Sequence, residues 1–279
     1  MRRYLLSLCA LLWAAHASAQ PTVAELEQCV ARNLPEHSAV LEFGIQAEDR
    51  EGGVQETAAT LLWRRGEAGE SRALLRIQEP AEMRGTAVLM ILREGHDPRT
   101  YVYLPEVEKV RRIRKGRLKG GLLGTDFSYE DFERLQGGDR SKRTQLGVLA
   151  APVQIDGRST WALEAIPDPD ERSAYRRVVT YIDPQTCLPL QMDFEDKQGQ
   201  LRKRLSTDIN AIRRDGERFV PASYLMQDLR DGTQTQLIVR HLDVAPHLAA
   251  EQLSKEALRP AGAAGAAEEA GATGAAGGL

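Results

Sequence analysis

The sequence predicts a mainly β protein of the α+β class, with antiparallel strands and only short helices. Short apolar runs such as Ala58–Trp63, Ala73–Ile77 and Thr86–Leu92 follow one another between glycine-rich turns, with no long helical pattern between them. This spacing favours antiparallel pairing, because parallel strands need long crossover connections. A hydrophobic content of 42% is sufficient for a core, and no linker interrupts residues 22–245. We therefore expect one domain over residues 20–259.

Residues 1–19 have the pattern of a cleavable signal peptide. Two arginines precede an apolar run, Tyr4–Ala15, and an A-x-A cleavage site follows at Ala17–Ala19. A buried N-terminal helix is the less favoured interpretation, and the run is too short for a membrane anchor. Cys9 does not indicate lipidation, because a leucine precedes it where a lipobox has a small residue. The pattern predicts export and fits a bacterial periplasm, although the sequence alone does not separate this from full secretion.

A helix is predicted directly after the cleavage site. Thr22 and Glu25 have the spacing of a capping box, and Asn33 and Pro35 end the segment. Between them, apolar residues recur at helical spacing: Val23, Leu26, Val30 and Leu34.

Two cysteines, Cys29 and Cys187, remain once Cys9 has left with the signal. In an oxidising compartment they are expected to form a disulfide, which would tie the first helix to the sheet. The alternative is two unpaired buried thiols. No CxxC motif is present and the histidines are scattered, so no metal site is expected.

One face of the predicted sheet carries large apolar side chains. The run Ala87–Leu92 is apolar on both faces, as in a strand covered on both sides by a helix or a ligand. A hairpin is predicted from Arg218–Gln227 and Thr235–Leu242 around an Asp-Gly turn. The apolar residues are either ordinary core or the lining of a lipid cavity, where methionine suits adaptable contact. The candidate lining residues are Trp63, Val88, Met90, Tyr101, Tyr103, Trp161, Leu163, Met192 and Phe194.

Several motifs occur in a distinctive order. A YLP motif ending at Pro105 is followed by VRRI, by a glycine-rich loop and by GTDFSYEDF at 124–132. The segments Glu79–Thr86 and Tyr181–Leu190 flank them, so that the matches span about 25–245. This arrangement resembles the LolA-like, outer-membrane lipoprotein-sorting family. The resemblance implies a curved, half-open antiparallel β-barrel whose mouth is covered by short helices, with an apolar hollow for acyl chains.

A basic block lies within the same stretch and contains no acidic residue. Its candidate contact residues are Lys109, Arg111, Arg112, Arg114, Lys115 and Arg117. The block is either a solvated strand edge that discourages association or a contact for anionic lipid headgroups or an acidic partner. Nucleic acid is not expected, because the net charge falls from −3 to −5 once the two signal arginines are removed.

No catalytic motif is present. The sequence lacks GxSxG, HExxH, a P-loop and a dinucleotide fingerprint. Asp126, Glu130 and Asp131 form a local acidic cluster, but capping a helix that begins near Ser128 is a better explanation than acid–base chemistry. We expect neither an enzyme nor a cofactor.

The chain is expected to end in a short helix over residues 248–258 and an Ala/Gly-rich tail over 260–279. The tail has almost no large side chain, so it cannot offset its ordering entropy and should be disordered.

These observations support a periplasmic carrier for the acyl chains of a lipoprotein or another envelope lipid. Such a carrier would be a monomer in transient contact with membranes, taking its cargo from an inner-membrane exporter and passing it to an outer-membrane acceptor. The alternative is a lipid-sensing regulatory module that docks a membrane partner without transport. A structural envelope protein that binds no lipid is the third possibility.

Overall fold

The computed structural model describes residues 20–66, 69–93, 95–113, 121–135, 144–169, 173–244 and 246–260 of the 279-residue chain. The strands of the first half are β1 (Ser38–Glu48), β2 (Val54–Arg65), β3 (Glu70–Glu79), β4 (Ala87–Arg93), β5 (Arg99–Leu104) and β6 (Lys109–Ile113). Those of the second half are β7 (Thr144–Val148), β8 (Val153–Ile155), β9 (Arg158–Pro167), β10 (Tyr175–Ile182), β11 (Pro189–Asp196), β12 (Leu201–Thr207), β13 (Ile212–Asp215), β14 (Arg218–Pro221), β15 (Ser223–Asp228) and β16 (Thr233–Asp243).

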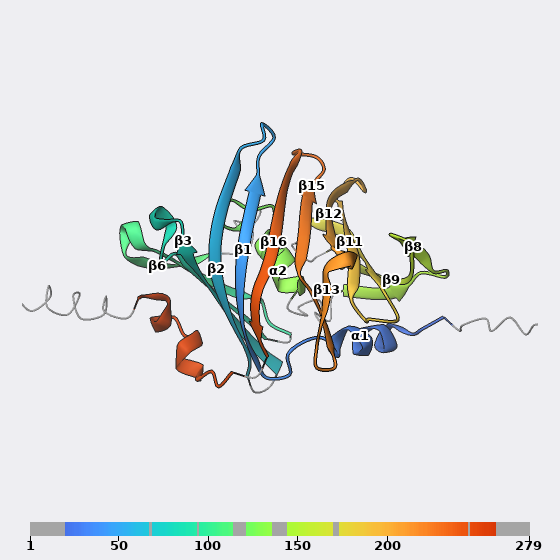
Figure 1. Cartoon of the computed structure of the whole chain (residues 1–279), viewed down its shortest axis with the longest axis horizontal. Helices are drawn as coiled ribbons and strands as arrows, with labels where there is room; N and C mark the ends of the chain where they lie inside the picture. The colour runs from blue at the N-terminus through green and yellow to red at the C-terminus, as the bar shows by residue number, and fades with distance from the viewer. Residues whose placement is uncertain are drawn as a thin grey trace, which may run out of the picture.

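Fourteen of these strands form one antiparallel sheet that curves around a short helix (Figure 1). Their order is β6-β5-β4-β3-β2-β1-β16-β15-β12-β11-β10-β9-β7, with β8 also pairing with β9. The two edge strands, β6 and β7, are not paired with each other in the described ranges, so the sheet stays open. The predicted mainly β, antiparallel and half-open architecture is confirmed.

The last long strand joins the two halves of the chain. β16 pairs with β1, which also pairs with β2, so residues from both ends of the sequence lie side by side. The register sets Phe43 opposite Val239 and Ile45 opposite Leu237. Directly opposed residues of an antiparallel pair point to the same face, so these four apolar side chains lie together.

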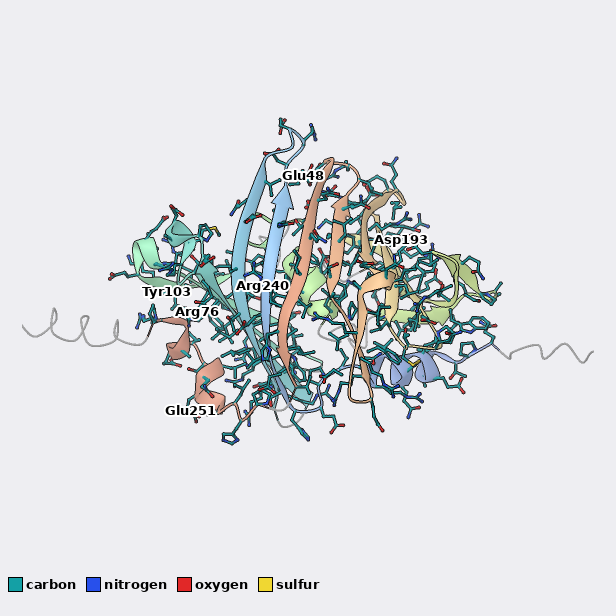
Figure 2. The ribbon with its side chains drawn as sticks, viewed as in Figure 1. Glu48, Arg76, Tyr103, Asp193, Arg240 and Glu251 are labelled. Atoms are coloured by element: carbon teal, nitrogen blue, oxygen red, sulfur yellow. A yellow bond between two sulfur atoms is a disulfide. The ribbon has the colours of Figure 1, made fainter. Side chains whose placement is uncertain are left out.

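The N-terminal helix α1 (Val23–Ala31) is attached to the second half of the sheet. Its predicted capping box is present: the Thr22 Oγ1 accepts from the Glu25 N–H at 3.2 Å, and the Glu25 carboxylate accepts from the Thr22 N–H at 2.7 Å. Cys29 on α1 forms a disulfide with Cys187, which lies between β10 and β11; the Cα atoms are 5.0 Å apart (Figure 2). The expected pairing of the two cysteines is therefore present in the structure.

The predicted hairpin around the Asp-Gly turn is present between β15 and β16. Its first strand was predicted as continuous over residues 218–227, which is wrong, because the chain changes its pairing partner in the middle. β14 pairs with β13 in a separate two-stranded sheet, whereas β15 pairs with β16. The change occurs at Ala222, whose N–H donates to the Ala211 carbonyl and whose carbonyl accepts from the Val239 N–H.

The predicted terminal helix is two short 3₁₀ turns, η6 (Ala250–Leu253) and η7 (Glu256–Leu258). The carbonyl oxygens of Leu253 and Leu258 accept hydrogen bonds from arginines of β3 and not from a continuing helix. None of the described helices has the length and hydrophobicity that a bilayer crossing requires. The expected signal (1–19) and residues 261–279 of the expected tail lie outside the described residues.

Candidate functional site

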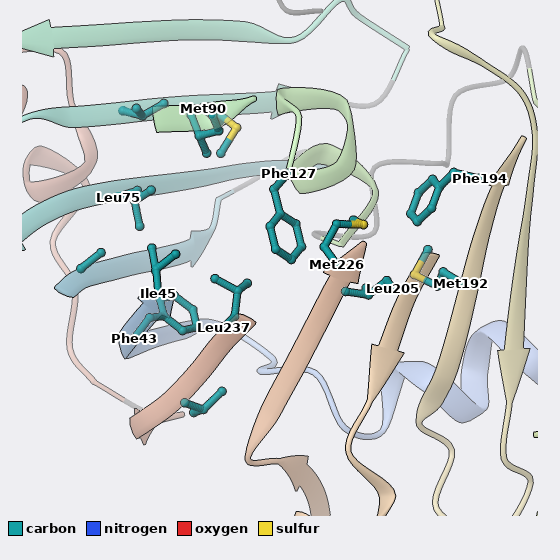
Figure 3. Packing of buried hydrophobic residues seen from close by; sticks show 14 of the residues in the cluster. Phe43, Ile45, Leu75, Met90, Phe127, Met192, Phe194, Leu205, Met226 and Leu237 are labelled. Atoms are coloured by element: carbon teal, nitrogen blue, oxygen red, sulfur yellow. The ribbon is translucent and has the colours of Figure 1, made fainter. Parts of the chain in front are cut away.

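The concave face of the sheet is a continuous apolar surface (Figure 3). Alternate residues of strands from both halves of the chain point to it and are buried. They include Phe43, Ile45, Leu75, Val88, Met90, Val178, Met192, Phe194, Leu205, Met226 and Leu237. The face is therefore built by the period-two patterning that the sequence shows along each strand.

A short segment of the chain covers this surface. We call residues 121–135 the plug; it contains the 3₁₀ turn η4 (Leu122–Gly124) and the helix α2 (Tyr129–Leu135). Leu122 and Phe127 are 1% and 0% exposed and belong to the same apolar cluster as the strands. Figure 3 shows the Phe127 ring pointing from the plug toward Met226 and Leu237. The plug thus packs against the concave face and completes its apolar core.

Gly121 makes the tight entry to the plug possible. A Cβ atom at this position would lie 1.9 Å from the Thr125 carbonyl oxygen, so no side chain fits without moving the backbone. The Leu122 N–H donates to the Phe127 carbonyl across the same turn. The close backbone approach therefore explains the glycine at position 121 of the sequence motif.

Asp126 attaches the plug to β16. Its carboxylate accepts hydrogen bonds from the hydroxyls of Thr233 and Thr235, the latter at 2.7 Å. Its N–H donates to the Thr235 Oγ1 at 2.9 Å, and its carbonyl accepts from the Lys203 Nζ of β12 at 2.6 Å. One residue of the plug is thus held by two strands.

Asp131 forms the most buried polar contact of the site. Its carboxylate accepts from the Tyr175 hydroxyl at 2.7 Å, from the Ser128 N–H at 2.7 Å and from the Lys203 Nζ at 3.1 Å. Asp131 is 1% and Lys203 8% exposed. Burial, reinforced by the Asp131 charge, raises the pKa of Tyr175, so the phenol keeps the proton that it donates.

Glu130 forms a third attachment. Its carboxylate accepts from the Ser173 hydroxyl, from the Ala174 N–H at 2.8 Å and from Arg134 at 3.1 Å. The three acidic residues of the cluster are therefore all engaged in holding the plug. The predicted capping contact is present too, because the Asp131 N–H donates to the Ser128 Oγ at 3.2 Å.

Seven of the nine candidate lining residues lie on the concave side. Trp63, Val88, Met90, Met192 and Phe194 are buried there. Trp161 and Leu163 are partly exposed on β9, and the register places them opposite Ile182 and Thr180; Thr180 is itself opposite Met192.

Tyr101 and Tyr103 do not belong to this lining and lie on the convex face. Tyr103 is buried against Leu89 and Leu258, and the Lys255 ammonium lies 5.1 Å from the centre of the Tyr101 ring. The alternation along β5 allowed either face to point inward. In the structure Val102 belongs to the concave cluster, so its neighbours along the strand, Tyr101 and Tyr103, point to the convex face.

The C-terminal segment, residues 248–258, explains why β4 is apolar on both faces. Three leucines of this segment, Leu248, Leu253 and Leu258, are buried against the convex face of the sheet. The Arg76 guanidinium donates to the Ala257 carbonyl at 2.6 Å and to the Leu258 carbonyl at 3.2 Å. Figure 2 shows Arg76 and Tyr103 on the side of the sheet that faces this segment. The convex side of β4 is therefore covered by the C-terminal segment of the same chain.

The basic block begins on the edge strand β6. Lys109, Arg111 and Arg112 are exposed there. The register places Arg111 opposite Val102, on the concave side, and Arg112 opposite Tyr101, on the convex side. The remaining candidates, Arg114, Lys115 and Arg117, lie outside the described residues.

Sequence reasoning missed Lys203 and Tyr175, the sheet residues that hold Asp131. Lys203 did give a signal, because it is a charged residue two positions before Leu205, at an inward position of the alternation. No such signal marked Tyr175 in the sequence, because a tyrosine at an inward position of a strand is common in an ordinary core. In the described part of the chain, no group of three His, Cys, Asp or Glu side chains is arranged to hold a metal ion.

A cavity of about 370 Å³ lies where the plug meets the hairpin between β1 and β2. Its lining includes Glu48 and Gln55 from the hairpin, Thr233 from β16, and Thr125 and Asp126 from the plug. The lining combines polar and apolar groups, and the cavity reaches the plug at Asp126, where the plug is attached to β16.

Comparisons with known proteins agree with this architecture. A family model described as an uncharacterized protein matches residues 69–260. No curated protein matches the chain. A putative outer membrane lipoprotein-sorting protein domain from Vibrio parahaemolyticus has a similar structure, with a TM-score of 0.74 at 21% identity over 85% of this chain and 97% of that chain.

Two further solved structures are similar. A DUF1329 family protein from Desulfovibrio piger gives a TM-score of 0.77 at 22% identity, over 86% of this chain and 100% of that chain. A LolA superfamily protein from Nitrosomonas europaea gives a TM-score of 0.63 at 18% identity, over 85% of this chain and 99% of that chain. These structures share the fold, and the family model spans more than half of the sequence. The chain belongs to the family of uncharacterized proteins that this model describes, and it has the fold of the lipoprotein-sorting domain and of the LolA superfamily protein.

Proposed function

We propose that this protein is a periplasmic carrier that binds the acyl chains of a lipoprotein or another envelope lipid on its concave face. The observation that carries the proposal is that, among the described residues, one short plug covers this large apolar face and no second sheet packs on it. The name of the similar Vibrio parahaemolyticus domain, which refers to outer membrane lipoprotein sorting, supports the same function. The signal-like residues 1–19 support export.

The energies are of the right size for reversible binding. Burying an acyl chain yields about 0.8 kcal/mol per CH₂, or roughly 10 kcal/mol for a chain of a dozen or more methylenes. Displacing the plug exposes Leu122 and Phe127, at about 1.5–3 kcal/mol each. It also breaks the contacts of Asp126 and Asp131, at roughly 1–3 kcal/mol for each buried group left unpaired. Gain and cost are comparable, which is what a carrier that must release its cargo requires.

The proposal is tested by native mass spectrometry, with lipid extraction, on the mature protein purified from its own periplasm without detergent. A lipid or acylated peptide present at close to one per protein molecule supports it and identifies the cargo class. A protein that carries no lipid and takes up no fluorescent fatty acyl probe would refute it.

Carrier and sensor are separated by a transfer experiment. The loaded protein is mixed with acceptor vesicles, and lipid transfer is followed by dequenching of a labelled chain. Stoichiometric transfer supports the carrier. Retention of the lipid, together with stable binding to one membrane partner, would favour the regulatory module.

A further inference from the structure

Lys203 and Tyr175 form a pair of hydrogen-bond donors on the concave face, beside the apolar residues Phe194, Leu205 and Met226. Lys203 lies opposite Phe194 in the register of β11 and β12, and Leu205 and Met226 are buried nearby. Tyr175 packs against Phe194, with ring centroids 5.1 Å apart. A charged ammonium in such surroundings is costly unless an anion accompanies it.

The anion is supplied by the plug. The facing strand offers Asp228 opposite Lys203, but that carboxylate is bound by Arg202 at 2.9 Å. Lys203 instead contacts Asp131 at 3.1 Å, and Tyr175 donates to the other oxygen of the same carboxylate at 2.7 Å. The sheet therefore holds two donors whose acceptor belongs to the segment that a ligand has to displace.

Their position suits the polar end of a lipid. Lys203 is the third residue of β12, close to the turn that connects it to β11, so the donors lie near one end of these strands. From there Leu205 and Met192, which are opposite each other, continue the apolar surface along the strands. A ligand with its head at Lys203 can lay its chain along this surface.

We propose that Lys203 and Tyr175 bind the oxyanion headgroup of an acyl ligand, in the place that the Asp131 carboxylate occupies when the plug is closed. The inference rests on the proposed function and specifies its ligand as an acyl chain ending in a carboxylate or phosphate. Ligand and plug compete for the same two donors, so displacement of Asp131 leaves no buried cation without a partner.

The test compares three ligands with the same chain and different heads: dodecanoate, dodecyl phosphate and dodecanol. Each displaces a fluorescent acyl probe from the mature protein. We expect the two anions to bind about tenfold or more tightly than the alcohol, the effect of one charged hydrogen bond. The ratio between dodecanoate and dodecyl phosphate shows which oxyanion the site prefers.

Variants assign the preference to the two donors. Lys203→Met should bring the anions to the affinity of the alcohol, whereas Asp131→Asn should strengthen anion binding by about tenfold, because it weakens the competing contact. The double variant Asp131→Asn/Lys203→Met removes both charges together, so no buried charge is left alone if the single Lys203 variant fails to fold.

The possible outcomes are distinct. Loss of the anion preference in the variants that lack Lys203 supports the inference. Equal binding of the three ligands by the wild type, or a preference that survives without Lys203, overturns it while leaving acyl binding intact. Failure of all three ligands to bind refutes the proposed function and this inference together.

Discussion

The Tyr175 hydroxyl on β10 donates a 2.7 Å hydrogen bond to the Asp131 carboxylate of α2. Both groups are buried, so water cannot replace the hydrogen bond that the carboxylate loses when the donor is removed. We predict that Tyr175→Phe lowers the free energy of unfolding by about 1–3 kcal/mol in urea denaturation. Tyr224→Phe is the matched control, because the Tyr224 hydroxyl has no hydrogen bond among the described contacts, and it should be nearly neutral. Equal effects of the two variants would contradict the anchoring role.

A second prediction concerns high pH. Burial raises the pKa of Tyr224 to about 12, and burial together with Asp131 raises that of Tyr175. Both folded values lie above the unfolded value of about 10, so this contribution to stability is complete below pH 10 and is lost as the pH rises toward 12. Urea midpoints measured from pH 8 to 11.5 should fall less for Tyr224→Phe than for the wild type. Parallel curves would contradict the prediction.

The disulfide is predicted to be a major source of stability. Cys29 and Cys187 are 158 residues apart, and closing so long a loop in the unfolded chain is worth up to roughly 5 kcal/mol. The variant Cys29→Ser/Cys187→Ser should unfold at clearly lower urea, and α1 should exchange its amide hydrogens faster. A reducing agent should lower the wild type to the same midpoint and leave the variant unchanged. No difference between oxidised and reduced wild type would refute this.

The plug should oppose ligand binding. Phe127→Ala removes its fully buried ring from the concave core and should cost about 3–5 kcal/mol of stability. The same change should strengthen uptake of a fatty acyl probe, because less apolar contact has to be given up. Leu89→Ala is the control, since Leu89 is equally buried but belongs to the convex cluster. It should lose stability without gaining affinity.

A gain in probe affinity for both Phe127→Ala and Leu89→Ala would indicate a general loosening of the fold. No gain for either would mean that the plug does not compete with the ligand.

The basic edge strand is predicted to contact anionic membranes. Lys109, Arg111 and Arg112 are exposed on β6, and each basic residue near an anionic surface is worth about 1 kcal/mol. Changing all three to Glu should weaken binding to phosphatidylglycerol vesicles by roughly a hundredfold at low salt, and high salt should remove the difference. The control changes three exposed arginines elsewhere: Arg32, Arg176 and Arg214. An equal loss of vesicle binding in both triple variants would contradict the prediction, because it would mean that β6 contributes only through non-specific charge attraction.

Local features of this fold were predictable because their causes lie within a few residues. The capping contacts of Thr22 with Glu25 and of Ser128 with Asp131 depend on three-residue spacings, which the sequence displays directly. The inward face of β11 follows from strict alternation, which places Met192 and Phe194 in the concave cluster.

Other features depend on contacts between distant segments. Tyr103 was assigned to the wrong face because β5 is covered on both sides, and its convex cover comes from Leu258, far along the chain. The pairing of Asp131 with Lys203 joins residues 72 positions apart, and no local pattern couples them. The strand over 218–227 was predicted as one because each half has strand propensity; the change of partner at Ala222 depends on β13.

The most direct measurement for the central claim combines photo-cross-linking with hydrogen exchange. A fatty acid carrying a diazirine is bound to the mature protein, and cross-linked peptides and amide exchange are mapped by mass spectrometry. We predict cross-links on concave residues such as Met192, Leu205 and Met226, with faster exchange over residues 121–135 in the bound state. Cross-links confined to the convex face, or an unchanged plug in the fully loaded protein, would contradict the account.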